Sequence, residues 1–158
     1  MAEMDNPFVA FTFIAGPAVL TNACAILQNS ATIRYGLAIP QWREFRAALV
    51  NNSGLLAALY IDPDLALALA ERRIRLLLRG LDLLYVAVGI FGFTCLVGLA
   101  SAALSMQALY VLPIWIVVVA GGAGLTAFIA AMALFTAESH CARSLLRLQL
   151  RLQEAGIA

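Results

Sequence analysis

The sequence contains no lysine, and it is poor in charge of either sign. Only 12% of its 158 residues are charged, about half the proportion usual in soluble domains. The net charge of +1 is too small to indicate a polyanionic partner, so we expect no nucleic acid to bind. Apolar residues make up 63% of the chain, more than a water-soluble fold of this size can keep from water. We therefore predict an all-α integral membrane protein.

Residue types that commonly carry catalysis are also scarce. His140 is the only histidine, and no Ser-His-Asp set is recognisable. Two of the three cysteines lie within apolar runs and the third lies beyond the last run, which favours apolar packing over a disulfide. Glu138, His140 and Cys141 are all potential metal ligands, but on a helix only Glu138 and Cys141 share a face. We expect no metal site, no cofactor and no enzymatic activity.

Three uncharged stretches are long enough to cross a hydrocarbon core of about 30 Å as helices. They lie at about 8–27, 83–104 and 109–135. Pro17 should kink or break the first stretch, and the short connection between the other two predicts an antiparallel hairpin. The chain is therefore predicted to form one membrane domain with three transmembrane helices.

The positions of the arginines predict the orientation, because basic loops stay on the cytoplasmic side. Seven arginines lie between the first two stretches and three follow the third, whereas the N-terminus and the second connection contain none. The N-terminus should lie outside, and residues of about 34–82 and a helix of about 138–155 should be cytoplasmic. Tyr110 and Trp115 should lie near the outer interface and Tyr85 near the inner one.

The predicted cytoplasmic segment begins with a short amphipathic helix. This helix should start at Pro40 and lie at the membrane interface on its apolar face of Trp42, Phe45 and Leu49. The sequence "NNSG" at 51–54 should end it.

A second, longer helix should follow in the same segment. Asp62 is suited to cap its N-terminus, and nothing obliges it to stop before about Leu104, although Gly80 could bend it. Its apolar first turns need a partner, for which the C-terminal helix is a candidate because it carries Leu145, Leu148 and Leu152 at heptad-like spacing.

Basic residues precede the second span and follow the third. In "ERRIRLLLRGLD" at 71–82, the arginines should meet lipid headgroups and set the topology. The residues assigned to this role are Arg72, Arg73, Arg75, Arg79, Arg143 and Arg147.

Two acids, Asp82 and Glu138, lie at the inner ends of the second and third spans. Charges at this depth are unfavourable unless they pair or reach water. Arg75 and Arg79 precede Asp82 and Arg143 follows Glu138, so pairing with these arginines is one interpretation. The alternative is that the acids attract cations to a path, which would require several copies of the chain.

Polar and small residues mark faces on which helices could associate. Asn22 is the most polar side chain deep in a span, and it could join helices or, with Gln28 and Asn29, line a hydrated path. Small residues in the third span recur every four positions, which is typical of close helix packing. They include Ala123, Gly124, Ala127 and Ala131.

Four stretches resemble a known family. They are "GPAVLTNACAILQNSATIRYG" (16–36), "WREFR" (42–46), "RRIRLLLRGLDLLYVAVGIFGF" (72–93) and "TAESHCARSLLRLQL" (136–150). In this pattern the first span contains a proline and ends in a polar run, a basic helix leads into the second span, and an acid follows the third. The chain resembles the small bacterial membrane proteins of domain-of-unknown-function family 2721. The resemblance implies the three-span fold in a bacterial inner membrane, and it implies no activity.

These features together favour a protein that works by association within the bilayer. We expect a non-enzymatic scaffold or accessory subunit, either as a homo-oligomer or within a larger membrane complex. A homo-oligomeric ion channel or pore is the alternative, and a membrane enzyme is a third, weaker one.

Overall fold

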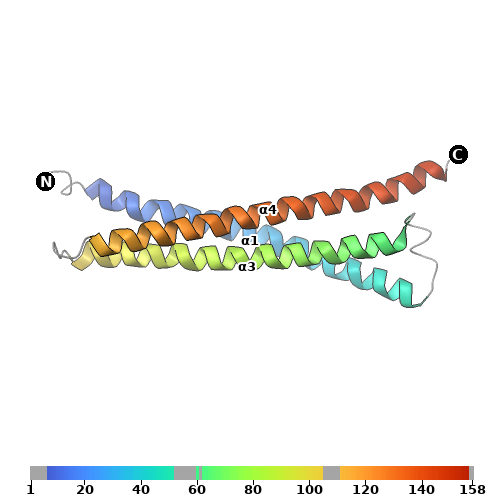
Figure 1. The fold of residues 1–158 in the computed structure, drawn as a ribbon, viewed down its shortest axis with the longest axis horizontal. Helices are drawn as coiled ribbons and strands as arrows, with labels where there is room; N and C mark the ends of the chain where they lie inside the picture. Colours follow the sequence, from blue (N-terminus) through green and yellow to red (C-terminus); the bar gives the residue numbers. More distant parts are fainter. Residues whose placement is uncertain (1–6, 52–59, 61, 105–110, 157–158) are drawn as a thin grey trace. The chain divides into compact units, whose positions relative to one another are not determined.

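A computed structural model describes residues 7–51, 60, 62–104 and 111–156. This part of the chain consists of three helices, α1 (Pro7–Val50), α3 (Pro63–Leu104) and α4 (Val111–Ala155), as Figure 1 shows. The predicted helical class is therefore confirmed. The predicted hairpin connection at 105–110 and Tyr110 within it lie outside the described residues.

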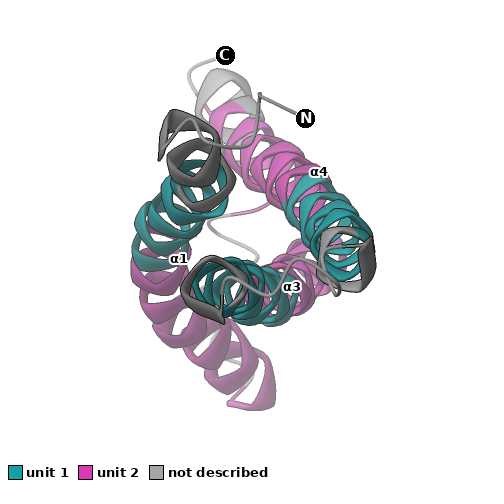
Figure 2. Ribbon diagram, turned by 90° about the vertical axis from the view of Figure 1, so that its left-hand side faces the viewer, with its two compact units in different colours: residues 1–29, 82–131 teal, residues 30–81, 132–158 magenta. Residues whose placement is uncertain are grey.

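Two compact units divide the chain, and each contains segments of all three helices (Figure 2). Unit 1 comprises residues 1–29 and 82–131, and unit 2 comprises residues 30–81 and 132–158. Within each unit, consecutive helical segments run in opposite directions (Figure 1).

Helix α1 is continuous over 44 residues, so the separate helix predicted from Pro40 is wrong, and of the kink or break predicted at Pro17 the break does not occur. Pro17 does not break it, and Pro40 does not begin a separate interfacial helix. A proline inside a helix costs about 3 kcal/mol, which tertiary packing can outweigh. Ala38 and Phe45, on either side of Pro40, are both buried within unit 2, so packing holds the helix on both sides of that proline. The predicted end of the helix is confirmed, since α1 stops at Val50.

Helix α3 begins and ends where the sequence predicts. The Asp62 carboxylate accepts a hydrogen bond from the Leu65 backbone N–H (3.0 Å), the geometry of an N-cap. The helix then runs from Pro63 to Leu104 without interruption at Gly80. At 1.5 Å per residue its 42 residues extend over about 60 Å.

Buried positions recur every seven residues along each helix, which is the repeat of coiled-coil packing. On α1 they are Cys24, Ala31, Ala38 and Phe45; on α3 they are Ala70, Leu77, Leu84 and Phe91; on α4 they are Gly124, Ala131, Glu138 and Leu145. A second row on α3 consists of Ala66, Arg73, Gly80, Ala87 and Thr94, of which only Arg73 is half-buried and the others are buried. Arg73 and Glu138 therefore occupy core positions in otherwise small or apolar rows.

An apolar cluster packs the three helices together in unit 2. Its buried members are Phe45, Tyr60, Ala66, Ala70 and Leu145, and half-buried side chains including Trp42, Leu49 and Leu148 pack against them. The apolar face predicted for residues 42–49 exists, but it packs on α3 and α4 of its own chain. The predicted pairing of the first turns of α3 with Leu145 and Leu148 is confirmed, whereas the side chain of Leu152 lies outside the described part.

Two helices contain stretches long and apolar enough to cross a membrane, Pro63–Ala100 in α3 and Trp115–Leu148 in α4. Only 22% and 11% of the most apolar parts of these stretches are buried, so most of their apolar side chains face outward. Both properties are compatible with a membrane protein. No such stretch is found in the described part of α1, so the third span at 8–27 stays a prediction.

Candidate functional site

A buried carboxylate joins the three helices within unit 2. Glu138 of α4 accepts a hydrogen bond from Arg73 Nε of α3 at 2.5 Å and another from Arg34 Nη1 of α1 at 3.4 Å. Arg73 Nη1 also donates to Gln41 Oε1 of α1 at 3.4 Å, and Arg34 Nη1 donates to Ser139 Oγ at 3.5 Å. We call these five side chains the Glu138 cluster.

Burial differs strongly among the charged members of this cluster. The side chain of Glu138 is 2% exposed, that of Arg73 is 19% exposed and that of Arg34 is 48% exposed. A buried carboxylate is unfavourable unless it is paired and hydrogen-bonded, and a guanidinium meets each of its oxygens here. The shorter, better-buried contact with Arg73 should provide most of this compensation, because exposed ion pairs contribute little.

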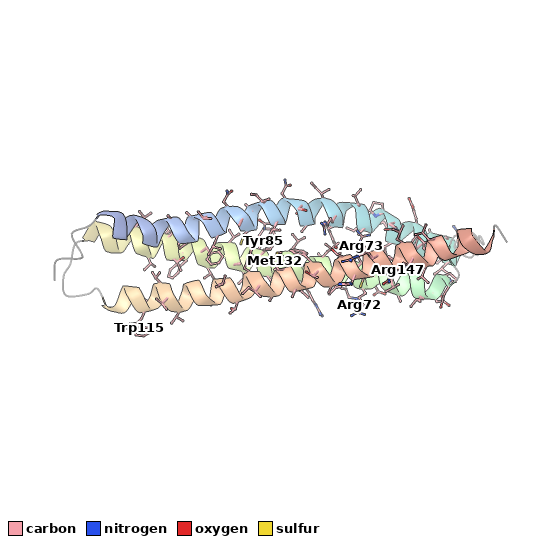
Figure 3. The ribbon with its side chains drawn as sticks, turned by 90° about the horizontal axis from the view of Figure 1, so that it is seen from above. Arg72, Arg73, Tyr85, Trp115, Met132 and Arg147 are labelled. Carbon is pink, nitrogen blue, oxygen red and sulfur yellow. The ribbon has the colours of Figure 1, made fainter. Side chains whose placement is uncertain are left out.

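Helical spacing explains how the partners reach the carboxylate. Arg34 and Gln41 are seven residues apart on α1 and therefore lie on the same side of it. On α3, Arg73 lies in the buried row between Ala66 and Gly80, whereas its neighbour Arg72 is exposed. Figure 3 shows that these two arginines leave α3 on different sides.

The partners predicted for the two acids are wrong. Arg143, expected to pair with Glu138, instead donates from Nε to the Ser139 backbone carbonyl at 3.4 Å. Asp82 is exposed, and among the described residues it forms no ion pair with Arg75 or Arg79. Arg75 pairs with Glu71 one turn earlier, at 3.7 Å. The spacing along the sequence predicted a partner close to Glu138 on its own helix, but its arginine partners lie on the two other helices.

The remaining arginines assigned to headgroups lie on the surface. Arg72, Arg75, Arg79, Arg143 and Arg147 are exposed, and Arg73 alone of the assigned set is turned into the core. Arg72 and Arg147 are labelled in Figure 3. These five side chains are exposed, with Arg75 paired to Glu71 and Arg143 bonded to the backbone of its own helix, whereas the Arg73 side chain is mostly buried against Glu138.

Glycine allows close contact between α3 and α4 in each unit. A Cβ on Gly124 would lie 2.7 Å from Cε1 of Phe91 in unit 1. A Cβ on Gly80 would lie 2.6 Å from Cε1 of Phe135 in unit 2. Each ring therefore packs against a bare helix backbone. Gly80, predicted as a bend, makes room for an aromatic ring instead.

The other small and polar candidates are divided between inner and outer faces. In the small-residue row Ala131 is buried, Ala127 is half-buried and Ala123 is exposed. Asn22 and Asn29 are exposed on α1, and Gln28 is half-buried. The structure thus places Gly124 against Phe91 and buries Ala131, and it leaves Asn22, Asn29 and Ala123 on the surface.

Potential metal ligands do not gather into a site within the described ranges. No group of three or more His, Cys, Asp or Glu side chains occurs there. Glu138 and Cys141 are buried and His140 is exposed, which agrees with the helix faces predicted for "ESHC".

Tyr60 connects the Glu138 cluster to the apolar cluster. Its ring packs edge-on against Phe45 with the ring centroids 5.3 Å apart. Burial raises the pKa of the Tyr60 phenol above its ordinary value, and a side-chain hydrogen bond with Gln41 partly offsets the increase. Since Gln41 also accepts from Arg73, a polar chain extends from Tyr60 to Glu138.

This raised pKa predicts a loss of stability at alkaline pH. The folded chain favours the neutral phenol, so the contribution is complete below the unfolded-state pKa of about 10 and is lost as the pH rises through the folded-state value. We expect Tyr60→Phe to lose less stability than the wild type between pH 9 and 11.5, measured by thermal unfolding in detergent. The chain contains no lysine, whose ammonium group would otherwise titrate in the same pH range.

The exposed Tyr85 supplies a control for that experiment. Tyr85→Phe removes an exposed phenol, so it measures what the loss of a tyrosine hydroxyl outside the buried clusters does to stability. Equal alkaline losses in the wild type and Tyr60→Phe would contradict the assignment to Tyr60.

The sequence did not predict the roles of Arg34 and Gln41 in the Glu138 cluster or of Tyr60 beside it. One feature of the sequence could have indicated a shared role, because Arg34 and Gln41 are seven residues apart and so lie on the same side of α1. No sequence pattern around Tyr60 indicated that its side chain would be buried.

Comparisons with known proteins identify no relative. No family model, no curated protein and no solved structure matches this chain. The family resemblance drawn from the sequence therefore stays a prediction, and function must be inferred from the residues themselves.

Proposed function

We propose that this protein is a three-span protein of the bacterial inner membrane that acts as a non-enzymatic scaffold or accessory subunit. In this proposal the helical segments of unit 1 lie in the bilayer and those of unit 2 extend into the cytoplasm. The protein would act by presenting helix faces to other membrane helices.

One observation carries this proposal, the unequal distribution of charge between the two units. All ten arginines belong to unit 2. In unit 1, residues 8–29 and 82–131 contain a single charged residue, Asp82. Helix contacts and charge thus divide the chain at nearly the same positions, as they would if one unit were solvated by lipid and the other by water.

The surface of unit 1 supports the same assignment. Large apolar side chains are exposed on all three of its helical segments, and they include Val19, Ile26, Phe93, Leu96, Leu99, Val118, Val119 and Ile129. Such extensive apolar exposure is unfavourable in water and ordinary in lipid. Trp115 projects outward near the start of α4 (Figure 3), and exposed Trp and Tyr side chains suit the membrane interface.

The Glu138 cluster supports a scaffold more than a channel. An acid that attracts cations to a path must be accessible, but the carboxylate of Glu138 is buried and bound by Arg34 and Arg73. Such a cluster can specify how helices pair, as polar groups at core positions of coiled coils do. In the proposed role it holds the three cytoplasmic helices in register.

Membrane extraction and topology mapping test this proposal. We expect the full chain to stay in the membrane pellet after carbonate treatment, and a reporter fused after Ala158 to score cytoplasmic. A single cysteine at Ala2, in a variant without native cysteines, should react with impermeant maleimide from outside the inner membrane.

The alternatives give different results in the same assays. Two spans with α1 outside the bilayer would leave Ala2 protected while the C-terminal reporter stayed cytoplasmic. Release of the protein by carbonate would contradict the proposal altogether. A selective conductance in vesicles, lost on Asn22→Leu, would favour the channel.

A further inference from the structure

One face of α1 in unit 1 combines apolar and amide side chains that its own chain does not cover. Val19 and Ile26 are 67% and 65% exposed, and Asn22 and Asn29 are exposed between and after them. The four positions are separated by three, four and three residues, so they share one side of the helix. We call these four residues the α1 outer face.

The amides on this face need a partner if unit 1 lies in lipid. No side-chain hydrogen bond of Asn22 or Asn29 occurs within the described part of the chain. Hydrocarbon offers neither donors nor acceptors, so a carboxamide exposed to it is left unsatisfied. Asn22 lies within the proposed span at 8–27 and Asn29 lies two residues beyond it, so lipid alone suits Val19 and Ile26 but does not suit Asn22.

A second copy of the same helix supplies what the face lacks. A carboxamide has both a donor and an acceptor, so two asparagines related by a two-fold axis can satisfy each other. Copies inserted in the same orientation place their α1 helices parallel, and the alternating spacing of three and four residues is that of the contact positions in a parallel coiled coil. No charge occurs within residues 8–29, so identical helices do not repel each other there. Ala18 and Ala25, both exposed beside the face, permit a close approach.

We propose that the protein forms a parallel dimer in which the α1 outer face of one copy binds the same face of a second copy. Asn22 meets Asn22 of the other copy, and this pairing fixes the register. The inference rests on the proposed function, because the amides require a partner only when unit 1 is in the membrane.

Energy transfer in vesicles tests this dimer. The full chain carries a donor or an acceptor dye at its C-terminus and is reconstituted in phosphatidylethanolamine and phosphatidylglycerol at several protein-to-lipid ratios. We expect energy transfer between the dyes, and we expect it to fall as the protein is diluted with lipid. Asn22→Leu should weaken association about tenfold. Because leucine is more apolar than asparagine, non-specific clustering would not fall in this way.

A pair of matched truncations locates the interface. Ile26 on α1 and Val119 on α4 are equally exposed, at 65% and 66%. We expect Ile26→Ala to weaken association and Val119→Ala to leave it unchanged. Association that is insensitive to Asn22→Leu, or that Val119→Ala weakens more than Ile26→Ala, would overturn the assigned face.

Vesicle flotation separates failure of this inference from failure of the proposed function. A chain that floats with the vesicles but shows no transfer at any ratio is a membrane monomer, which overturns the dimer alone. A monomeric chain that co-purifies with a stoichiometric second protein also overturns the dimer, and it leaves the accessory-subunit role standing. A chain that does not float overturns both.

Discussion

Glu138→Gln is expected to lower the free energy of unfolding by about 3 kcal/mol, because it removes the carboxylate that compensates the largely buried guanidinium of Arg73. The Glu138 side chain is 2% exposed and Arg73 is 19% exposed, so water cannot replace the lost partner. Breaking a buried ion pair by removing one member typically costs about 3 to 5 kcal/mol. The measurement is reversible unfolding of the full chain in detergent micelles.

Two comparisons separate this effect from a general loss of charge. Glu71 pairs with Arg75 on the exposed surface of the same unit, and Glu71→Gln should cost less than about 0.5 kcal/mol. Arg34→Gln should fall between the two, since Arg34 is half-exposed and makes the longer contact. A loss for Glu138→Gln no larger than that for Glu71→Gln would show that the buried pair is not stabilising.

Replacing both members of the pair gives a sharper result. Apolar residues of similar volume often substitute for a buried ion pair with little loss, because neither charge is left unpaired. Glu138→Leu together with Arg73→Met should therefore be more stable than Glu138→Leu alone. If this double variant forms a looser or mispaired bundle, as judged by hydrogen exchange, the cluster acts chiefly in specifying register.

The second large effect concerns two glycines of α4 that lie two residues apart. Gly124→Ala is expected to destabilise the protein by about 1 to 3 kcal/mol, because the added Cβ would lie 2.7 Å from the buried ring of Phe91. Gly122 has open space at its Cβ position, so Gly122→Ala should stabilise the helix by up to about 1 kcal/mol. Unfolding of the two single variants in the same detergent gives the comparison.

A double variant tests whether the Phe91 ring is the cause. Phe91→Leu removes the atoms that meet the new methyl group, so its own cost should be smaller when Gly124 is already alanine. Residues in contact typically couple by about 0.5 to 3 kcal/mol in such a cycle. Strict additivity of the two substitutions, or equal effects of Gly122→Ala and Gly124→Ala, would contradict the close contact.

Helical structure could be read largely from the sequence, since it depends on local chemistry. Asp62 followed by Pro63 defined the beginning of α3, and the uncharged run after Asp82 defined its continuation. The prediction failed at Pro40, where local propensity favours a break but the helix continues, and α1 is likewise unbroken at Pro17. Buried side chains on both sides of Pro40 overrode the local preference, which a rule based on neighbouring residues does not include.

The candidate site was predictable only in its central residue. The position of Glu138 at the inner end of an apolar stretch identified it as an acid in need of a partner, and an arginine was the expected type. Its partners, however, lie 104 and 65 residues away in sequence. Helical periodicity relates residues three, four and seven apart, and it contains no information about which helix faces which.

The sequence by itself determined the helical class, the ends of α3, and the separation of an arginine-free part from a part that holds every arginine. These properties follow from composition, capping and hydropathy, which are local and additive. The tertiary structure decided that Arg73 leaves the basic surface to meet Glu138, that Gly80 and Gly124 receive phenylalanine rings, and that Asn22 stays outside. These outcomes depend on the relative rotation of packed helices, because a turn of a few tens of degrees about a helix axis exchanges an exposed side chain for a buried one.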